Sequence, residues 1–249
     1  MDGVLIIDKP IGITSHDVVS RVRRILGERS VGHTGTLDPF ASGVLVVLVG
    51  RATRLAQFLS GSDKEYEAVI RLGFATDTGD RTGTPLSDNN AAAASLVWSD
   101  EEIEAAMKNL RGEIQQVPPM YSAKKQGGRK LYELARRGEQ VERQPVRVII
   151  RAFAAAGSAA HNPAGTTDLT VRVECSAGTY IRTLAEDFGK QLGVGAHLAE
   201  LRRTRVGNLT IGQALTLEQL EERGHEADSR RDHCHCPQVL AGQQAGEAR

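Results

Sequence analysis

The stretch Gly32-His33-Thr34-Gly35-Thr36-Leu37-Asp38-Pro39 is followed at residues 44–49 by the unbroken apolar run Val-Leu-Val-Val-Leu-Val. Such a run predicts a strand that is buried on both faces. A glycine-rich loop leading into a buried strand can bring the backbone close to a ligand and present one side chain on a rigid support. The spacing is not that of a phosphate-binding P-loop. Asp38 is therefore a candidate for chemistry, although an aspartate before proline is also typical of an ordinary turn.

Strand and helix patterns alternate irregularly along the rest of the chain, which favours an α+β fold with a mixed, mostly antiparallel sheet flanked by helices and loops. Strands are predicted at residues 3–7, 65–74, 146–154 and 167–175. Two capping-box spacings predict helix starts, and glycines predict the ends. The predicted helices run from Thr14 to Gly27, from Ser99 to Gly112 and from Ile181 to Gly193, with a short helix near 55–59.

Length and composition describe an ordinary globular protein of 249 residues, 40% of them hydrophobic. No apolar run is long enough to span a bilayer, and three cysteines fit a reducing compartment, so we expect a cytoplasmic protein with no membrane partner. We expect one catalytic domain at residues 1–212. Residues 213–249 are expected to form a short helix at 217–222 and then a mobile tail. A low-complexity linker is expected at residues 91–95.

A basic segment stands out although the net charge of the chain is zero. Residues 122–147 carry eight lysines and arginines against three glutamates, within an excursion that we place at residues 117–147 with a helix near residues 131–137. A long excursion in a compact domain is often functional, and a local surplus of positive charge suits phosphate contacts. On charge alone, a solvated helix is an equally good interpretation.

Two further side chains could serve chemistry on a nucleobase. Arg182 follows Gly178-Thr179-Tyr180-Ile181 where a strand turns into a helix, and Tyr66 lies on a predicted strand. An arginine can keep a carboxylate ionised, and a tyrosine can stack on an extruded base. A surface arginine and a core tyrosine are the alternatives for each residue taken singly.

The ordered motifs of the chain resemble the TruB-type tRNA pseudouridine synthases. The resemblance spans about residues 3–212 and rests on several runs that occur in the order of that family. These are Asp8-Lys9-Pro10, Gly32 to Pro39, Ala41-Ser42-Gly43, Lys64-Glu65-Tyr66, Leu72-Gly73, Thr76 to Asp80, Pro118 to Lys124, Gly178 to Leu184, Gly195 to Leu198 and Leu201 to Thr204.

The resemblance implies a role for each matching residue. Asp38 matches the catalytic aspartate, Tyr66 the tyrosine that stacks on the target base, and Arg182 the arginine that pairs with the aspartate and lowers its pKa. The basic excursion resembles a thumb-like loop that closes over the RNA. The implied substrate-binding residues are His33, Tyr180 and Leu201 at the nucleotide pocket, together with Lys9, Lys124, Arg129 and Lys130.

The implied reaction converts uridine 55, in the T-arm loop of tRNA, to pseudouridine. It breaks the C1′–N1 bond and rejoins uracil through C5, so no cofactor or metal is expected. Asp38 could attack C1′ as a carboxylate does in retaining glycosidases, act on the base, or help remove the C2′ proton. His33 could fill the place that the flipped base vacates.

Several features leave the function open in detail. Residues 222–249 show no strands that could build a complete RNA-binding domain of PUA type, which many bacterial members carry, so we expect none. The run His233-Cys234-His235-Cys236 does not match common zinc spacings, and the segment Thr76–Asp80 could touch RNA or form a plain turn. We expect a monomer.

The competing functions are a non-catalytic RNA-binding or tRNA-folding module and a synthase that acts on another RNA, alone or with a guide RNA.

Overall fold

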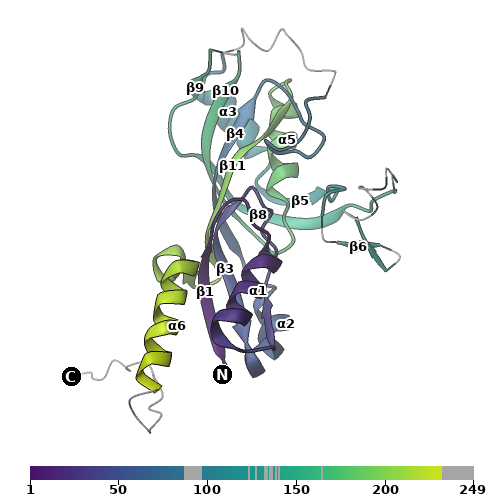
Figure 1. Ribbon diagram of the computed structural model, residues 1–249. Helices are drawn as coiled ribbons and strands as arrows, with labels where there is room; N and C mark the ends of the chain where they lie inside the picture. The colour runs from purple at the N-terminus through teal and green to yellow at the C-terminus, as the bar shows by residue number, and fades with distance from the viewer. Residues whose placement is uncertain are drawn as a thin grey trace, which may run out of the picture.

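The computed structural model describes residues 1–86, 97–122, 124–126, 128–131, 134, 137, 139, 141–163 and 165–231. Within them, ten strands form one mixed, mostly antiparallel sheet with helices packed against it, which confirms the predicted α+β fold (Figure 1). The order along the sheet is β1-β3-β11-β4-β10-β8-β5, with β2, β9 and β12 at its margins. The bounds are β1 Gly3–Lys9, β2 Val31–His33, β3 Ser42–Val49, β4 Lys64–Leu72, β5 Gly112–Gln116, β8 Val146–Ala155, β9 Ala160–His161, β10 Thr167–Cys175, β11 Ala196–Val206 and β12 Leu209–Thr210.

The apolar run that decides the fold forms β3, and its residues from Gly43 to Val49 are all buried, as predicted. One edge of β3 pairs with β1 along its length. Its other edge pairs with β2 at residues 47–49 and, in parallel, with β11 at Ser42 and Gly43. The glycine-rich loop leaves the sheet in the space between β2 and β11. The strand therefore anchors the loop at both of its ends.

The central strand β11 was not predicted from the sequence. It pairs with β4 over most of its length, and β-bulges shift the register between Leu198 and Glu200 and again between Arg203 and Arg205. Each bulge resets the alternation of inward and outward side chains, so no simple period of two appears. The strand also buries a charged residue, Arg203, which is only 1% exposed. The edge strand β5 was missed as well.

Capping chemistry fixes the helix starts as predicted. Thr14 and Asp17 make a complete capping box at α1 (Ser15–Leu26), and Gly27 ends this helix in the left-handed conformation. Ser99 and Glu102 do the same for the start of α3 (Asp100–Lys108). The predicted end of α3 was wrong, because the helix stops at Lys108. Gly112, with φ of +85°, instead begins β5.

Two larger apolar cores lie on the sheet, and a smaller third cluster is formed by Val44, Val46 and Leu48 of β3 with Val206 of β11. In the larger one, α3 and α5 (Ile181–Gln191) cover β4, β8, β10 and β11; Phe153 and Phe188 pack edge to face at its centre with their ring centroids 5.4 Å apart. In the second core, α1 and α6 (Leu217–Arg231) pack with β1, β2 and β3. The 3-10 segments η1 (Gly50–Leu55) and η3 (Ile211–Gln213) and the single turn α2 (Ala56–Leu59) complete these elements.

The C-terminal helix is longer than predicted, because α6 runs to Arg231 and does not end near residue 222. Thr216 and Gln219 cap its start reciprocally, and Leu217 and Leu220 are buried against α1. The following residues include Glu, Arg and Ala, which favour helix once it has begun. The predicted tail beyond residue 231, the run at 233–236 and the linker at 91–95 lie outside the described residues.

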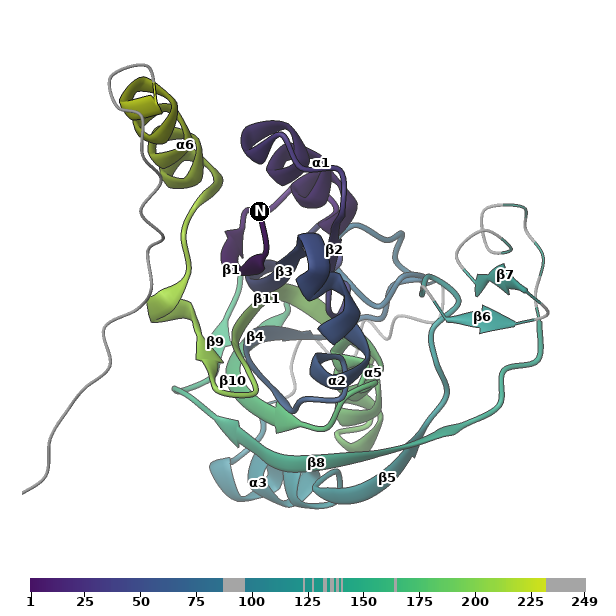
Figure 2. The same cartoon turned by 90° about the horizontal axis from the view of Figure 1, so that it is seen from below.

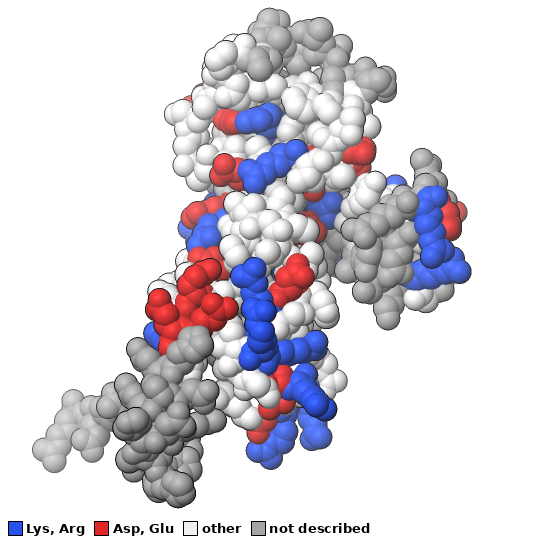
Figure 3. Space-filling model, viewed as in Figure 1, with Lys and Arg blue, Asp and Glu red and all other residues white. Residues whose placement is uncertain are grey.

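The basic excursion leaves the sheet through β5 and returns through β8. It carries the small hairpin of β6 (Lys125–Gln126) and β7 (Arg129–Lys130), which projects from the body (Figure 2). The helix predicted near residues 131–137 falls largely outside the described residues. Lysine and arginine side chains gather along the outer edge of this projection (Figure 3).

Candidate active site

Asp38 is fixed by backbone contacts on either side of it. Ser15, on α1, accepts from the Leu37 amide through Oγ at 2.8 Å and donates to the Leu37 carbonyl at 3.1 Å. The Pro39 carbonyl accepts from the Gly12 amide at 2.8 Å, and the side chains of Leu37 and Phe40 are buried. The loop is thus tied to α1 and to the core. Asp38, between these two buried side chains, stays partly open, with 34% of its side chain exposed.

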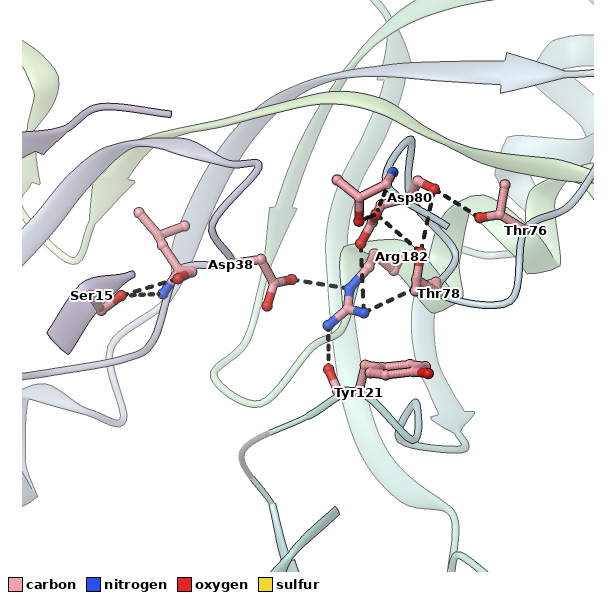
Figure 4. A network of polar contacts seen from close by, with 9 residues as sticks. Ser15, Asp38, Thr76, Thr78, Asp80, Tyr121 and Arg182 are labelled. Atoms are coloured by element: carbon pink, nitrogen blue, oxygen red, sulfur yellow. Dashed lines mark hydrogen bonds and ion pairs between the residues drawn. The ribbon is translucent and has the colours of Figure 1, made fainter. Parts of the chain in front are cut away.

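Arg182 faces Asp38 from the first turn of α5. Its Nε lies 3.0 Å from Asp38 Oδ2, and its side chain is 6% exposed (Figure 4). The guanidinium also donates through Nη1 to the Thr78 carbonyl at 3.0 Å and through Nη2 to the Tyr121 carbonyl at 2.7 Å. These contacts fix the plane of the guanidinium, so that Nε points at the carboxylate. The predicted pairing of Asp38 with Arg182 is present.

Asp80 is a second carboxylate beside Arg182 that the sequence did not single out. Its Oδ2 lies 3.8 Å from Arg182 Nη1, and its side chain is 5% exposed. Its Oδ1 accepts from the Thr78 hydroxyl at 3.0 Å and from the Thr82 amide at 2.9 Å. The segment Thr76–Asp80, for which an RNA contact and a turn were both open, is therefore a turn that packs behind Arg182.

The pKa of Asp38 is raised above its ordinary value of 3.8, and burial is the main cause. Arg182 and Lys9 act in the opposite direction, while the charge of Asp80 adds to the increase. The expectation that Arg182 lowers this pKa holds for the pair itself, but desolvation outweighs it. Asp38 is consequently a more basic carboxylate than a free aspartate.

A cavity of about 240 Å³ opens beside the ion pair. Asp38, Tyr66, Tyr180, Arg182, Leu201 and Lys124 all line it, so six of the predicted site residues share one space. Tyr66 is 7% exposed and comes from β4, where it forms a cross-strand pair with Arg203 of β11. Burial raises the pKa of the Tyr66 hydroxyl, which keeps the phenol neutral.

The other predicted substrate-binding residues lie outside this cavity. His33 ends β2, and its Nδ1 is buried without a hydrogen-bond partner among the described residues. Arg129, which is exposed, and Lys130 form β7 on the projecting hairpin. Lys9 is fully buried and donates from Nζ to the carbonyls of Pro10 at 2.9 Å and Ile13 at 2.8 Å. Burial lowers the pKa of Lys9 to about 8.

Residues 23–181 match the TruB family pseudouridylate synthase N-terminal domain, and residues 182–239 match the tRNA pseudouridylate synthase B C-terminal domain. The chain belongs to the TruB family of pseudouridylate synthases. A tRNA pseudouridine synthase B from Ralstonia nicotianae is 51% identical over 88% of this chain and 68% of its own length. The enzyme of the same name from Burkholderia mallei is 48% identical over 89% of this chain and 70% of its own length.

Two solved structures are similar to this chain. A Cbf5–Nop10–Gar1 complex contains a chain that matches with 32% identity and a TM-score of 0.69. The match covers 94% of this chain but only 57% of that chain. An H/ACA ribonucleoprotein bound to a substrate RNA containing 2′-deoxyuridine gives a TM-score of 0.66 at 30% identity. The family resemblance expected from the ordered motifs is confirmed, and with it an isomerase that makes pseudouridine in tRNA.

The two matched ranges meet between Ile181 and Arg182, inside the first turn of α5. The sheet contains strands from both matched ranges, because β11 of the second range pairs with β3 and β4 of the first. The candidate site thus takes Asp38 and Tyr66 from one matched range and Arg182 from the other. The domain division proposed near residue 212 stays a prediction.

Two cations at the TruB-type site were missed as functional candidates, although both stand in quoted motifs. Lys64 and Arg203 line the same cavity as Asp38 and Tyr66. Arg203 is the largest fully buried side chain among the described residues, and Lys64 is 6% exposed. The signal that could have found them is a charged residue at an inward position of a strand, since such a residue is rarely buried without a purpose.

Among the described residues, no group of three or more His, Cys, Asp or Glu side chains could hold a metal ion. No helix in the described part of the chain is long and apolar enough to cross a membrane. The single cysteine in that part, Cys175, is buried in the core, and burial raises the pKa of its thiol to about 11.

Proposed function

We propose that this chain isomerises the uridine at position 55 in the T-arm loop of tRNA, with Asp38 as its catalytic carboxylate. The observation that carries the proposal is the Asp38–Arg182 pair, 3.0 Å apart, at the wall of a cavity of about 240 Å³ that Tyr66 also lines. A cavity of this size admits one extruded nucleoside and no base-paired stretch. The arrangement suits chemistry on a flipped nucleotide.

Asp38 is the group that acts at the sugar. Breaking the C1′–N1 bond leaves electron deficiency at C1′, which the ionised carboxylate can relieve by attacking C1′ or by taking a proton from C2′. Arg182 holds the carboxylate in place, and its own contacts with Thr78 and Tyr121 prevent it from swinging away. Both routes need Asp38 ionised and close to the ribose.

Tyr66 and Leu201 provide the surface for the base. Flipping a base out of a folded loop costs a few kcal/mol, and stacking on an aromatic ring offsets part of that cost. His33, which is partly exposed at the end of β2, supports flipping by taking the place that the extruded base vacates. Burial lowers the pKa of His33, which favours a neutral ring that can take the place of a base.

The basic excursion is the proposed contact to the T-arm backbone. Lys124 lies at the cavity, and Arg129 is exposed on the hairpin beyond it. By contrast, the outer face of the sheet neutralises its own charges through ion pairs such as Arg71–Asp168 at 2.7 Å and Arg172–Glu65 at 2.6 Å. The phosphate groups of the RNA should therefore bind more favourably to the excursion than to the outer face of the sheet.

A transcript of the T-arm stem-loop tests the proposed target. Purified protein should convert one loop uridine to pseudouridine without guide RNA, partner protein or cofactor, and leave an anticodon stem-loop transcript of equal length unmodified. Conversion of the anticodon arm at a similar rate would contradict the target. Binding of the T-arm with no conversion would instead favour a tRNA-folding module.

A further inference from the structure

Two buried cations stand beside Tyr66 in the cavity wall without a carboxylate partner. Arg203 is 1% exposed and Lys64 is 6% exposed. Neither forms an ion pair with any residue that the structure describes. The two carboxylates next to Lys64 in the chain are engaged by other residues, Asp63 by Arg151 at 2.7 Å and Glu65 by Arg172 at 2.6 Å. The cavity wall thus holds two positive charges that the protein itself leaves unneutralised.

Neutral groups hold both cations in position. Lys64 Nζ donates to the carbonyls of Ser60 at 2.8 Å and Ser62 at 2.6 Å. Arg203 donates from Nε to the Val44 carbonyl at 2.7 Å and from Nη2 to the Gly35 carbonyl at 3.1 Å. Carbonyl dipoles orient a cation but do not neutralise its net charge. Burying an unpaired charge is costly, so its presence at a ligand cavity points to negative charge on the ligand.

The cations lie next to Tyr66, on which the base would stack, because Arg203 is its cross-strand partner and Lys64 precedes it by two residues on the same face of β4. Burial lowers the pKa of Lys64, and the neighbouring positive charge of Arg203 lowers it further. Asp38, the group proposed to act at the sugar, and Arg182 line the same cavity. A base stacked on Tyr66 would then share the cavity with both the carboxylate and the two cations.

The proposed reaction creates negative charge at that place. When the C1′–N1 bond breaks, its electron pair stays with N1, and uracil becomes an anion whose charge spreads over N1, O2 and O4. Asp38 relieves the deficiency at C1′ by attack or by C2′ proton removal. C5 then bonds to C1′, either displacing Asp38 from C1′ or as C2′ regains its proton from Asp38. The proton on C5 is lost and N1 is protonated, so product and substrate are isomers.

We propose that Arg203 and Lys64 stabilise the uracil anion while it is detached from the ribose. This rests on the proposed function and adds two catalytic residues to it. A pair of charges also suits the rotation of the ring, because attraction to a charge persists while the base turns from N1 to C5. A single fixed hydrogen bond would be broken by that turn. Preorganised groups aimed at developing charge are a large source of rate acceleration.

The test compares uridine with 5-fluorouridine in the T-arm transcript under single-turnover conditions. Fluorine withdraws electrons, so the 5-fluorouracil anion needs less help from the protein. Cleavage is followed as loss of the starting nucleoside after nuclease digestion. Lys64→Met and Arg203→Gln should each slow cleavage of uridine about 100-fold, the scale of losing one charge-stabilising donor. On 5-fluorouridine each deficit should shrink to about tenfold or less, with RNA affinity unchanged.

Matched variants separate charge from structure. Arg203→Lys should recover a substantial part of the rate on uridine. Arg202→Met removes an arginine from the other face of the same strand, where it pairs with Asp8 at 2.7 Å, and should leave the ratio of the two substrates at the wild-type value. Thermal melting identifies a variant that does not fold. If Arg203→Gln fails to fold, the Lys64→Met variant tests the proposal by itself. The Lys64 ammonium hydrogen-bonds only the two carbonyls of Ser60 and Ser62 among the described residues, so its loss should disturb the fold less.

Two results would overturn the proposal. One is an equal deficit on uridine and 5-fluorouridine, which would make the cations structural supports. The other is a loss of rate explained by weaker RNA binding, which would assign them to a phosphate of the substrate. Failure of the wild-type protein to convert uridine at all would instead refute the proposed function.

Discussion

The guanidinium of Arg182 lies between two carboxylates, with Nε 3.0 Å from Asp38 Oδ2 and Nη1 3.8 Å from Asp80 Oδ2. Only Asp38 opens onto the cavity, since Asp80 is 5% exposed and bonded to its own turn. The charge of Arg182 is thereby shared, and the pKa of Asp38 stays raised by burial. The arrangement makes testable statements about pH, stability and binding.

Replacing Asp80 by asparagine should move the acid limb of kcat/KM to lower pH. Asp38 acts in its ionised form, so activity is present above its pKa and is lost as the pH falls through it. That pKa lies above 3.8, partly because of the charge of Asp80, and Asp80→Asn removes this contribution. Asp168→Asn, on the outer face of the sheet, serves as the control and should leave the limb in place. An acid limb of kcat/KM that moves to higher pH in Asp80→Asn would contradict the assignment.

Asp38→Asn should be more stable than the wild type at neutral pH. The pKa of Asp38 is raised on folding. Its contribution to stability is therefore fully present below about pH 4 and is lost as the pH rises through the pKa of Asp38 in the folded protein. Asparagine has no proton to lose. The difference in melting temperature should therefore be small near pH 4 and grow to a plateau at higher pH. A wild type that melts higher than the variant at pH 7 would show that Arg182 outweighs burial.

Removing two cations from the excursion should weaken RNA binding and flatten its salt dependence. Each lost phosphate contact reduces the slope of log K against log salt by roughly 1, so Lys124→Ala with Arg129→Ala should reduce it by roughly 1 to 2. Binding of the T-arm transcript across a salt series measures the slope. Arg71→Ala with Arg172→Ala removes the same charge from the outer face and should leave the slope unchanged. An unaltered slope in the first pair would refute the excursion as an RNA contact.

Gly43→Ala should damage the fold severely. Gly43 has φ of +104°, and an added Cβ would lie 2.2 Å from the Arg203 carbonyl oxygen, where β3 meets β11. Backbone cannot move aside as a flexible side chain can, so a loss of about 3 kcal/mol or more in unfolding free energy is expected. Urea unfolding measures it. Gly3→Ala, where the added Cβ meets nothing within 4 Å, should be tolerated.

The sequence predicted those elements whose signals are local. The capping boxes at Thr14 and Ser99, the apolar run of β3 and the strict alternation in β10 each lie within a few residues. The central strand β11 was not predicted, because two bulges break the alternation of its inward and outward side chains. The end of α3 was not predicted because Gly112 begins β5. The length of α6 was not predicted, although the residues after Leu220 include several that favour helix once it has begun.

The site was predictable only through ordered motifs. Asp38, taken by itself, is an aspartate in a turn, and no local pattern reveals that it meets Arg182. The roles of Asp80, Lys64 and Arg203 depend on contacts across the chain. Arg203, for example, donates to the carbonyl of Val44, which is 159 residues away. Such contacts become visible only when β11 is placed beside β3 and β4.

Single-turnover conversion of the T-arm transcript by Asp38→Asn, with RNA binding measured on the same preparation, tests the central claim most directly. The variant keeps the size of the side chain and loses its charge. It should bind the transcript as tightly as the wild type and form no pseudouridine. Pseudouridine formation by this variant at the wild-type rate would contradict the assignment of Asp38 as the catalytic carboxylate.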